Sequence, residues 1–117
     1  MNPEVLPQRD ESAEARIRQY LISSKEAHTF DVANLSLSED QLLTIVHLID
    51  LSEKARASLH EGTWSKEDHV LYEEVRGKLD VILSAPVTSD TSDEGMLAAF
   101  LKNKLMVIDL IDAKYHK

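Results

Sequence analysis

The C-terminal segment of the chain constrains the fold more than any other feature. From Met96 to Ile111, twelve of sixteen residues are apolar. A helix this apolar must be covered on several sides, and a chain of 117 residues offers little material to cover it. Charged residues interrupt the run, so it is too polar for a bilayer span. The segment therefore predicts a helix that packs against the rest of the chain or against a partner.

The remaining sequence also favours helices. Glycine and proline are scarce, with three of each, and Val, Ile and Thr do not form the alternating runs of strands. We expect helices at about 12–28, 38–61, 65–84 and 93–115, after a disordered leader at 1–11 that contains two prolines. Residues 12–117 then form a single all-α domain, a helical hairpin or small four-helix bundle.

Capping residues define the central hairpin. Ser38 and Gln41 have the spacing of a capping box at the start of the second helix, and Gly62 supplies a left-handed cap at its end. Ser65 caps the third helix, with Asp68 at the reciprocal position. The connection between these helices is short, which predicts an antiparallel pair.

The boundaries of the last loop are also marked. The third helix should stop before Pro86, because the residue preceding a proline disfavours the helical conformation. Thr91 and Glu94 have the spacing of another capping box, which predicts that Thr91 caps the start of the fourth helix.

Composition excludes several function classes. The chain has no cysteine, so disulfides and thiolate chemistry are ruled out. The net charge is −8 and no run of Lys or Arg offsets it, so we expect no direct nucleic-acid binding. The N-terminal residues lack the apolar region of a secretory signal. We therefore expect a cytoplasmic protein that is not bound to a membrane.

A catalytic or metal-binding set is difficult to find. The five histidines include no pair at helical i, i+4 spacing and no zinc-protease signature, and the three glycines stand apart, so there is no phosphate loop. We expect no catalytic residue, no metal and no cofactor, and hence no enzyme. The rival interpretation is a metal site built on His60 and His69, which flank the hairpin turn.

Two apolar faces exceed what a small monomer can easily cover, which predicts self-association or a partner groove. The first lies on the last helix, and we expect it to form a partner-binding or dimer interface. Its predicted residues are Leu97, Phe100, Leu101, Lys104, Ile108 and Ile111. The second apolar contact, on the second helix, comprises Leu42, Ile45, Val46 and Ile49. Which face dimerises and which binds the partner stays open.

Two residues depart from the pattern of their helices. Lys104 lies near the centre of the apolar arc, where it either snorkels to water or pairs with an acid across an interface. Gly77 lies inside the third helix, in line with Val70 and Val81. It is either a tolerated glycine, at a cost of about 1 kcal/mol against alanine, or a point where another backbone approaches closely.

The layout resembles a known family. A helical hairpin at 38–62 and 65–83 is followed by an apolar last helix, within a small acidic chain. This arrangement is similar to the all-helical anti-activators of LuxR-type quorum-sensing regulators, the TraM and QslA type. The resemblance covers about residues 12–117 and rests on architecture. It implies a homodimer that sequesters a transcription factor and blocks its dimerisation or DNA binding.

A second interpretation stays within the binding class. An immunity protein or a secretion chaperone would also be small, acidic and prone to dimerise, but its partner would be a toxin or an effector. A bundle that only self-assembles is a third possibility.

Overall fold

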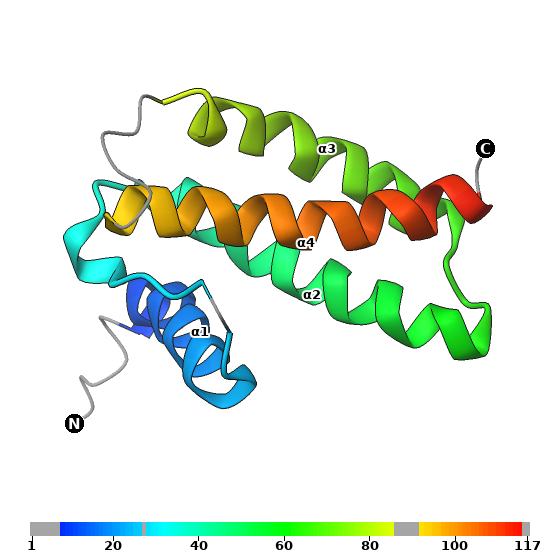
Figure 1. Ribbon diagram of the computed structural model, residues 1–117, viewed down its shortest axis with the longest axis horizontal. Helices are drawn as coiled ribbons and strands as arrows, with labels where there is room; N and C mark the ends of the chain where they lie inside the picture. Colours follow the sequence, from blue (N-terminus) through cyan, green and yellow to red (C-terminus); the bar gives the residue numbers. More distant parts are fainter. Residues whose placement is uncertain (1–7, 27, 86–91, 116–117) are drawn as a thin grey trace.

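The computed structural model describes residues 8–26, 28–85 and 92–115. These residues form four α-helices and one 3-10 turn, and no strand (Figure 1). The elements are α1 (Gln8–Ser24), the 3-10 turn (Val32–Asn34), α2 (Glu39–Glu61), α3 (Lys66–Leu83) and α4 (Asp93–Tyr115). The predicted all-α class is confirmed.

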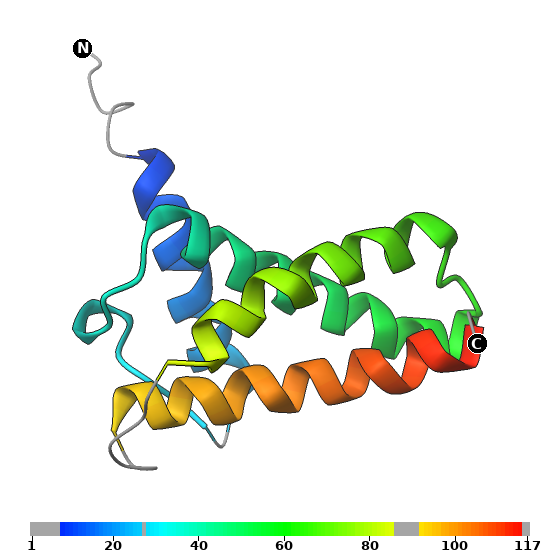
Figure 2. The same ribbon diagram turned by 90° about the horizontal axis from the view of Figure 1, so that it is seen from above.

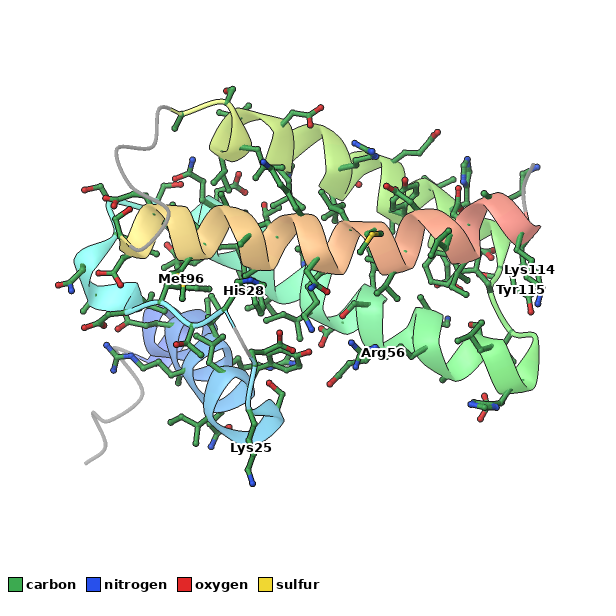
Figure 3. The ribbon with its side chains drawn as sticks, viewed as in Figure 1. Lys25, His28, Arg56, Met96, Lys114 and Tyr115 are labelled. Atoms are coloured by element: carbon green, nitrogen blue, oxygen red, sulfur yellow. The ribbon has the colours of Figure 1, made fainter. Side chains whose placement is uncertain are left out.

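Three of the helices run along the long direction of the molecule, and α1 lies across one end (Figures 1 and 2). α2 makes its most extensive contact with α4 and a further one with α3, while α1 packs on α2. The end of α4 reaches the α2–α3 turn, where Figure 3 labels Lys114 and Tyr115. There the Tyr115 hydroxyl donates to the Ser58 carbonyl over 3.1 Å, which joins the C-terminal ends of α2 and α4.

The predicted caps of α2 and α3 are confirmed. The Gln41 N–H donates to Ser38 Oγ over 3.1 Å, and the Ser38 N–H donates to Gln41 Oε1 over 2.9 Å. Gly62 ends α2 with φ 65°, in the left-handed region. Ser65 and Asp68 form the same reciprocal pair at the start of α3. These local bonds fix where the hairpin turns.

The bounds of α1 differ from the prediction. The helix begins at Gln8 instead of Ser12 and ends at Ser24 instead of His28. Lys25, with φ 54°, leaves the helical region, and this turn brings Glu26 to α4. Residues 1–7 of the predicted leader lie outside the described residues, whereas 8–11 belong to α1.

The two ends of the last loop also differ slightly from the prediction. α3 stops at Leu83, one residue early. The predicted cap of α4, Thr91, lies outside the described residues, and the observed capping group is the next residue, Ser92. Its Oγ accepts from the Gly95 N–H over 3.1 Å.

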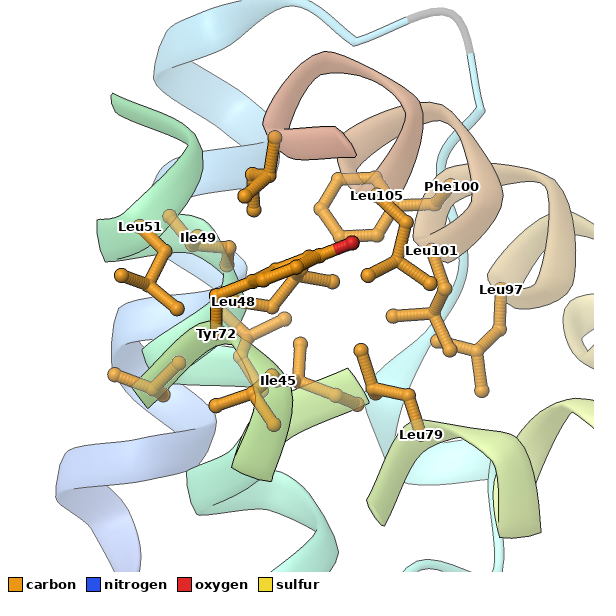
Figure 4. Close-up of a cluster of buried hydrophobic side chains, with 14 of the residues drawn as sticks. Ile45, Leu48, Ile49, Leu51, Tyr72, Leu79, Leu97, Phe100, Leu101 and Leu105 are labelled. Atoms are coloured by element: carbon orange, nitrogen blue, oxygen red, sulfur yellow. The ribbon is translucent and has the colours of Figure 1, made fainter. Parts of the chain in front are cut away.

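One apolar core fills the space between the four helices (Figure 4). We call residues 28–38, between α1 and α2, the connector. It contributes the buried side chains of Phe30 and Val32, so this segment is held against the bundle. Leu51 of α2 is also buried, whereas Leu71 of α3 is 37% exposed.

Candidate interaction surface

The residues predicted to contact a partner or a second subunit lie inside the protein. Those on α4 are all buried: Leu97, Phe100, Leu101, Lys104, Ile108 and Ile111. On α2, Leu42 is half-buried and the rest are buried: Ile45, Val46 and Ile49. Neither set therefore offers a free face in this structure, and a surface for a partner must be sought elsewhere.

The chain covers α4 because α1 and the connector close over it. Phe100 is fully buried, and two rings meet it edge to face, with centroids 6.1 Å away for Tyr20 and 5.4 Å away for Phe30. Aromatic pairs favour this edge-to-face arrangement. The sequence estimate of apolar excess did not account for the connector, which acts as a further covering element.

Lys104 is paired within the chain. Its side chain is 1% exposed, and its Nζ donates to Glu26 Oε2 over 2.6 Å. The Tyr20 hydroxyl donates to the same oxygen over 3.2 Å, and the ammonium lies 4.9 Å from the centroid of the Tyr20 ring. Lys104 thus neither snorkels nor reaches across an interface. It joins α4 to the turn that follows α1.

Apolar side chains nevertheless remain at the surface. Among the described residues, the large ones that are exposed are Ile22, Leu43, Leu59, Val70, Leu71, Val81, Met106 and Leu110. Three of these belong to α3, two to α4 and two to α2. Two of the three residues on α3, Val70 and Val81, lie on the same side of that helix as Gly77.

Val70, Gly77 and Val81 share one side of α3, because a helix turns about 100° per residue. Val70 is 58% exposed and Val81 is 66% exposed. The opposite side of α3 is buried against the core through Tyr72, Val75 and Leu79. We call the side that carries Val70, Glu74, Gly77 and Val81 the outer face of α3.

The surface of the outer face is lowest at Gly77, near its middle, because glycine has no side chain. A Cβ atom added there would meet no atom within 4 Å. The close approach that the sequence suggested is therefore not made by any described part of the chain. The missing side chain exposes the α3 backbone between two exposed valines.

A groove runs beside the first half of the outer face. It measures about 440 Å³ and is lined by Lys66, Glu67, Val70, Leu71 and Glu74. Two carboxylates, two aliphatic side chains and one lysine therefore share one hollow. This combination suits an amphipathic partner better than a purely apolar one.

A second hollow, of about 540 Å³, lies between α1 and the connector. Leu21, Phe30 and Val32 contribute to its lining, and Asp93 lies on its edge. The Asp93 carboxylate is already engaged, because it accepts from the Asp31 N–H and from Asn34 Nδ2, each over 3.1 Å. These bonds attach the connector to the start of α4.

The buried polar groups near the hairpin turn stabilise the fold. Asp112, on α4, is 8% exposed and accepts from Trp64 Nε1 over 3.0 Å. His69 Nδ1 donates to the same carboxylate over 2.8 Å, since an ionised carboxylate can only accept. His69 Nε2 lies 3.5 Å from Glu73. These contacts tie the turn and α3 to the last turns of α4.

A second polar cluster joins α3 to α4 through Asp109. The Tyr72 hydroxyl donates to Asp109, and Arg76 Nη2 lies 3.3 Å from the same carboxylate. Burial, together with the bond to Asp109, raises the pKa of Tyr72. The bond from Arg76 to the Tyr72 oxygen, followed by the charge of Asp109, raises the pKa of Arg76. Tyr72 therefore stays neutral and Arg76 stays charged at neutral pH.

Asp68 combines capping with an ion pair. Its carboxylate accepts from the Ser65 N–H over 2.9 Å and lies 2.9 Å from Lys54 Nζ. Burial opposes ionisation, but the bonds from Ser65 and Lys54 outweigh it, so the pKa of Asp68 is lowered. The pair connects α2 to α3 at the hairpin end.

The histidines that flank the turn do not gather into a ligand set. His60 is exposed and His69 is bound to Asp112. Within the described residues, no three His, Asp or Glu side chains are grouped to hold a metal ion. No described helix is long and apolar enough to cross a bilayer.

Comparisons with protein-family models, with curated proteins and with solved structures found no match for this chain.

Sequence reasoning missed the outer face of α3 although its signal was present. The alignment of Gly77 with Val70 and Val81 was recognised, but the larger apolar total of α4 outweighed it. The relevant quantity is the apolar surface left after folding, and that depends on which helix lies in the middle of the bundle.

Proposed function

We propose that the protein is a non-enzymatic protein-binding module, and that it acts as an anti-activator that sequesters a LuxR-type quorum-sensing regulator. The observation that carries the binding role is the outer face of α3. Its valines stay exposed although the core is already closed by other residues. Apolar side chains grouped at a surface and rimmed by charge are typical of interaction sites.

The choice of partner rests on the architectural resemblance to all-helical anti-activators. The titratable groups with the strongest internal contacts also support a binding role, because they hold helices together. Asp112 and Asp109 join α3 to α4, and Asp68 joins α2 to α3. A group committed in this way to the fold is poorly placed to transfer protons to a substrate.

The test is to express the tagged protein in its native cell and identify what co-purifies in stoichiometric amount. Size exclusion with light scattering then gives the composition of the complex and measures the predicted homodimer. A LuxR-type regulator that loses DNA binding in the complex supports the anti-activator function. A toxin or a secreted effector in its place assigns the protein to the immunity or chaperone class, and the anti-activator proposal is then wrong.

A further inference from the structure

Resting on the proposed binding function, we infer that the outer face of α3 receives a basic amphipathic helix of the partner protein. The helix would lay a narrow apolar stripe along Val70, Gly77 and Val81, with Lys or Arg residues on both sides. Three observations carry this assignment, namely the shape of the face, its charge, and the state of the cations beside it.

The shape favours a helix. Val70, Gly77 and Val81 follow the axis of α3 at spacings of seven and four residues, which is the pattern of a helical contact. Space at Gly77 is open, so a second helix can approach the α3 backbone closely at that point. Small residues at a contact allow this close approach. The groove beside Val70 and Leu71 gives room for the side chains of the partner.

The charge favours a basic partner. By the helical turn of about 100° per residue, Glu67 and Glu74 lie along one side of the apolar stripe. Glu73 and Asp80 lie along the other side. All four side chains are exposed, and the protein as a whole carries a net charge of −8. A partner with cations on both sides of its own stripe would meet carboxylates on both sides of this one.

The three cations of α3 offset this field only in part. Lys66 is exposed and lines the groove beside Val70, where it offsets one of the four acids. Arg76 is turned to Asp109 on α4 at 3.3 Å. Lys78 Nζ lies 3.8 Å from Asp40 on α2 and 3.9 Å from Glu74. Arg76 and Lys78 are therefore engaged by carboxylates of the same chain.

Of the flanking acids, Glu74 shares Lys78 and Glu73 lies 3.5 Å from His69 Nε2. Glu67 on one side of the stripe and Asp80 on the other are therefore the carboxylates best placed to meet a partner.

The same arrangement disfavours a second copy of the chain as the occupant. In an antiparallel two-fold pair of helices each flank meets its own counterpart, so Glu73 would lie beside Asp80 of the other copy. In a parallel pair the two flanks meet each other, and their four acids outnumber Lys66 and Lys78. Like charges at such positions destabilise a helix pair.

The assignment is tested by titrating ¹⁵N-labelled protein with a stapled 18-residue helical peptide that carries alanine and leucine on one face and lysine on both flanks. The control peptide has the same composition in a scrambled order, so it keeps the charge and loses the stripe. We expect amide shifts centred on the outer face of α3. We also expect the scrambled peptide to bind about tenfold more weakly or worse.

A matched pair of variants separates shape from charge. Gly77→Leu adds a side chain to the centre of the outer face, whereas Ala113→Leu adds the same side chain to an exposed position on α4. Both variants should fold. Gly77→Leu should weaken the peptide by about tenfold or more, and Ala113→Leu should leave it unchanged.

Three results would overturn the assignment. The first is a shift map centred on another surface, and the second is equal binding by the two leucine variants. The third is a set of α3 shifts that depend on protein concentration without peptide, which would give this face to a second copy. If Gly77→Leu still captures the native partner in full, the proposed function stands and this site is wrong. If the peptide binds α3 but no native partner is found, the site on α3 stands and the proposed function is wrong.

Discussion

α3 and α4 differ in opposite ways from what their sequences suggest. α4 contains the most apolar segment of the chain, and six of its twelve apolar residues are buried, while Met106 and Leu110 are exposed. α3 is rich in charge, yet it leaves Val70 and Val81 in solvent. The apolar composition of a helix therefore indicates how much of its surface must be buried on folding. An interaction site is marked by what stays uncovered after folding.

The difference follows from position in the bundle. α4 is bordered by α2 and α3, and Glu26 and Tyr20 from the α1 region cover part of its remaining side. α3 packs against α2 and α4, and its other side faces outward. A helix at the edge of a small bundle keeps one free side whatever its composition.

The largest expected effect is on α4, where Phe100 is fully buried. Phe100→Ala should lower the free energy of unfolding by about 3–5 kcal/mol, because it removes a fully buried ring and leaves a cavity. Val81→Ala on the outer face should change it by less than about 0.5 kcal/mol. Urea unfolding followed by circular dichroism measures both. Similar losses for the two variants would abolish the distinction between α4 and α3.

The next effect concerns the buried ion pair that closes α4. Glu26→Ala should destabilise the protein by about 3 kcal/mol, because it leaves the ammonium of Lys104 buried without its acid. Adding Lys104→Met should restore most of the loss, since methionine has a similar length and no charge. Equal stability of the single and the double variant would show that the charge of Lys104 is satisfied without Glu26.

A smaller effect, with a pH signature, is expected where α3 meets α2. The pKa of Asp68 is lowered below its ordinary value of 3.8, so its contribution is fully present above that pH and is lost as pH falls through the folded-state pKa. Asp68→Asn should cost about 1 kcal/mol at pH 7.

The check is to compare the wild type with Asp68→Asn by urea unfolding at several pH values. The gap between them should close in strong acid, where the wild-type carboxylate is also protonated. A gap that stays constant down to pH 2 would mean that the carboxylate charge is not what stabilises the hairpin.

The smallest effect has the opposite sign. Gly77→Ala should stabilise the free protein by about 0.5–1 kcal/mol, because alanine is the better helix former and its Cβ meets no atom within 4 Å. Thermal unfolding measures the gain. A loss of stability would show that a contact at Gly77 exists in the free protein.

Local signals made much of the fold predictable. Ser38, Gly62 and Ser65 set the hairpin through bonds between residues close in sequence, and their positions were correct. The pairing of Lys104 was not predictable, because its acid lies 78 positions away and is presented by a turn at Lys25, not by a helix. The outer face of α3 was only partly predictable. The apolar stripe on α3 can be read from the sequence, but the exposure of that stripe depends on which helices lie at the centre of the bundle.

The contact between Glu26 and Lys104 has a consequence for the order of assembly. Glu26 leaves the ribosome long before α4 does, so the site that receives it does not yet exist when the first helix is made. α1 can therefore complete its packing only after α4 has formed. We expect amide hydrogens of α1 to exchange faster than those of α2, because the element that docks last is also the first to detach.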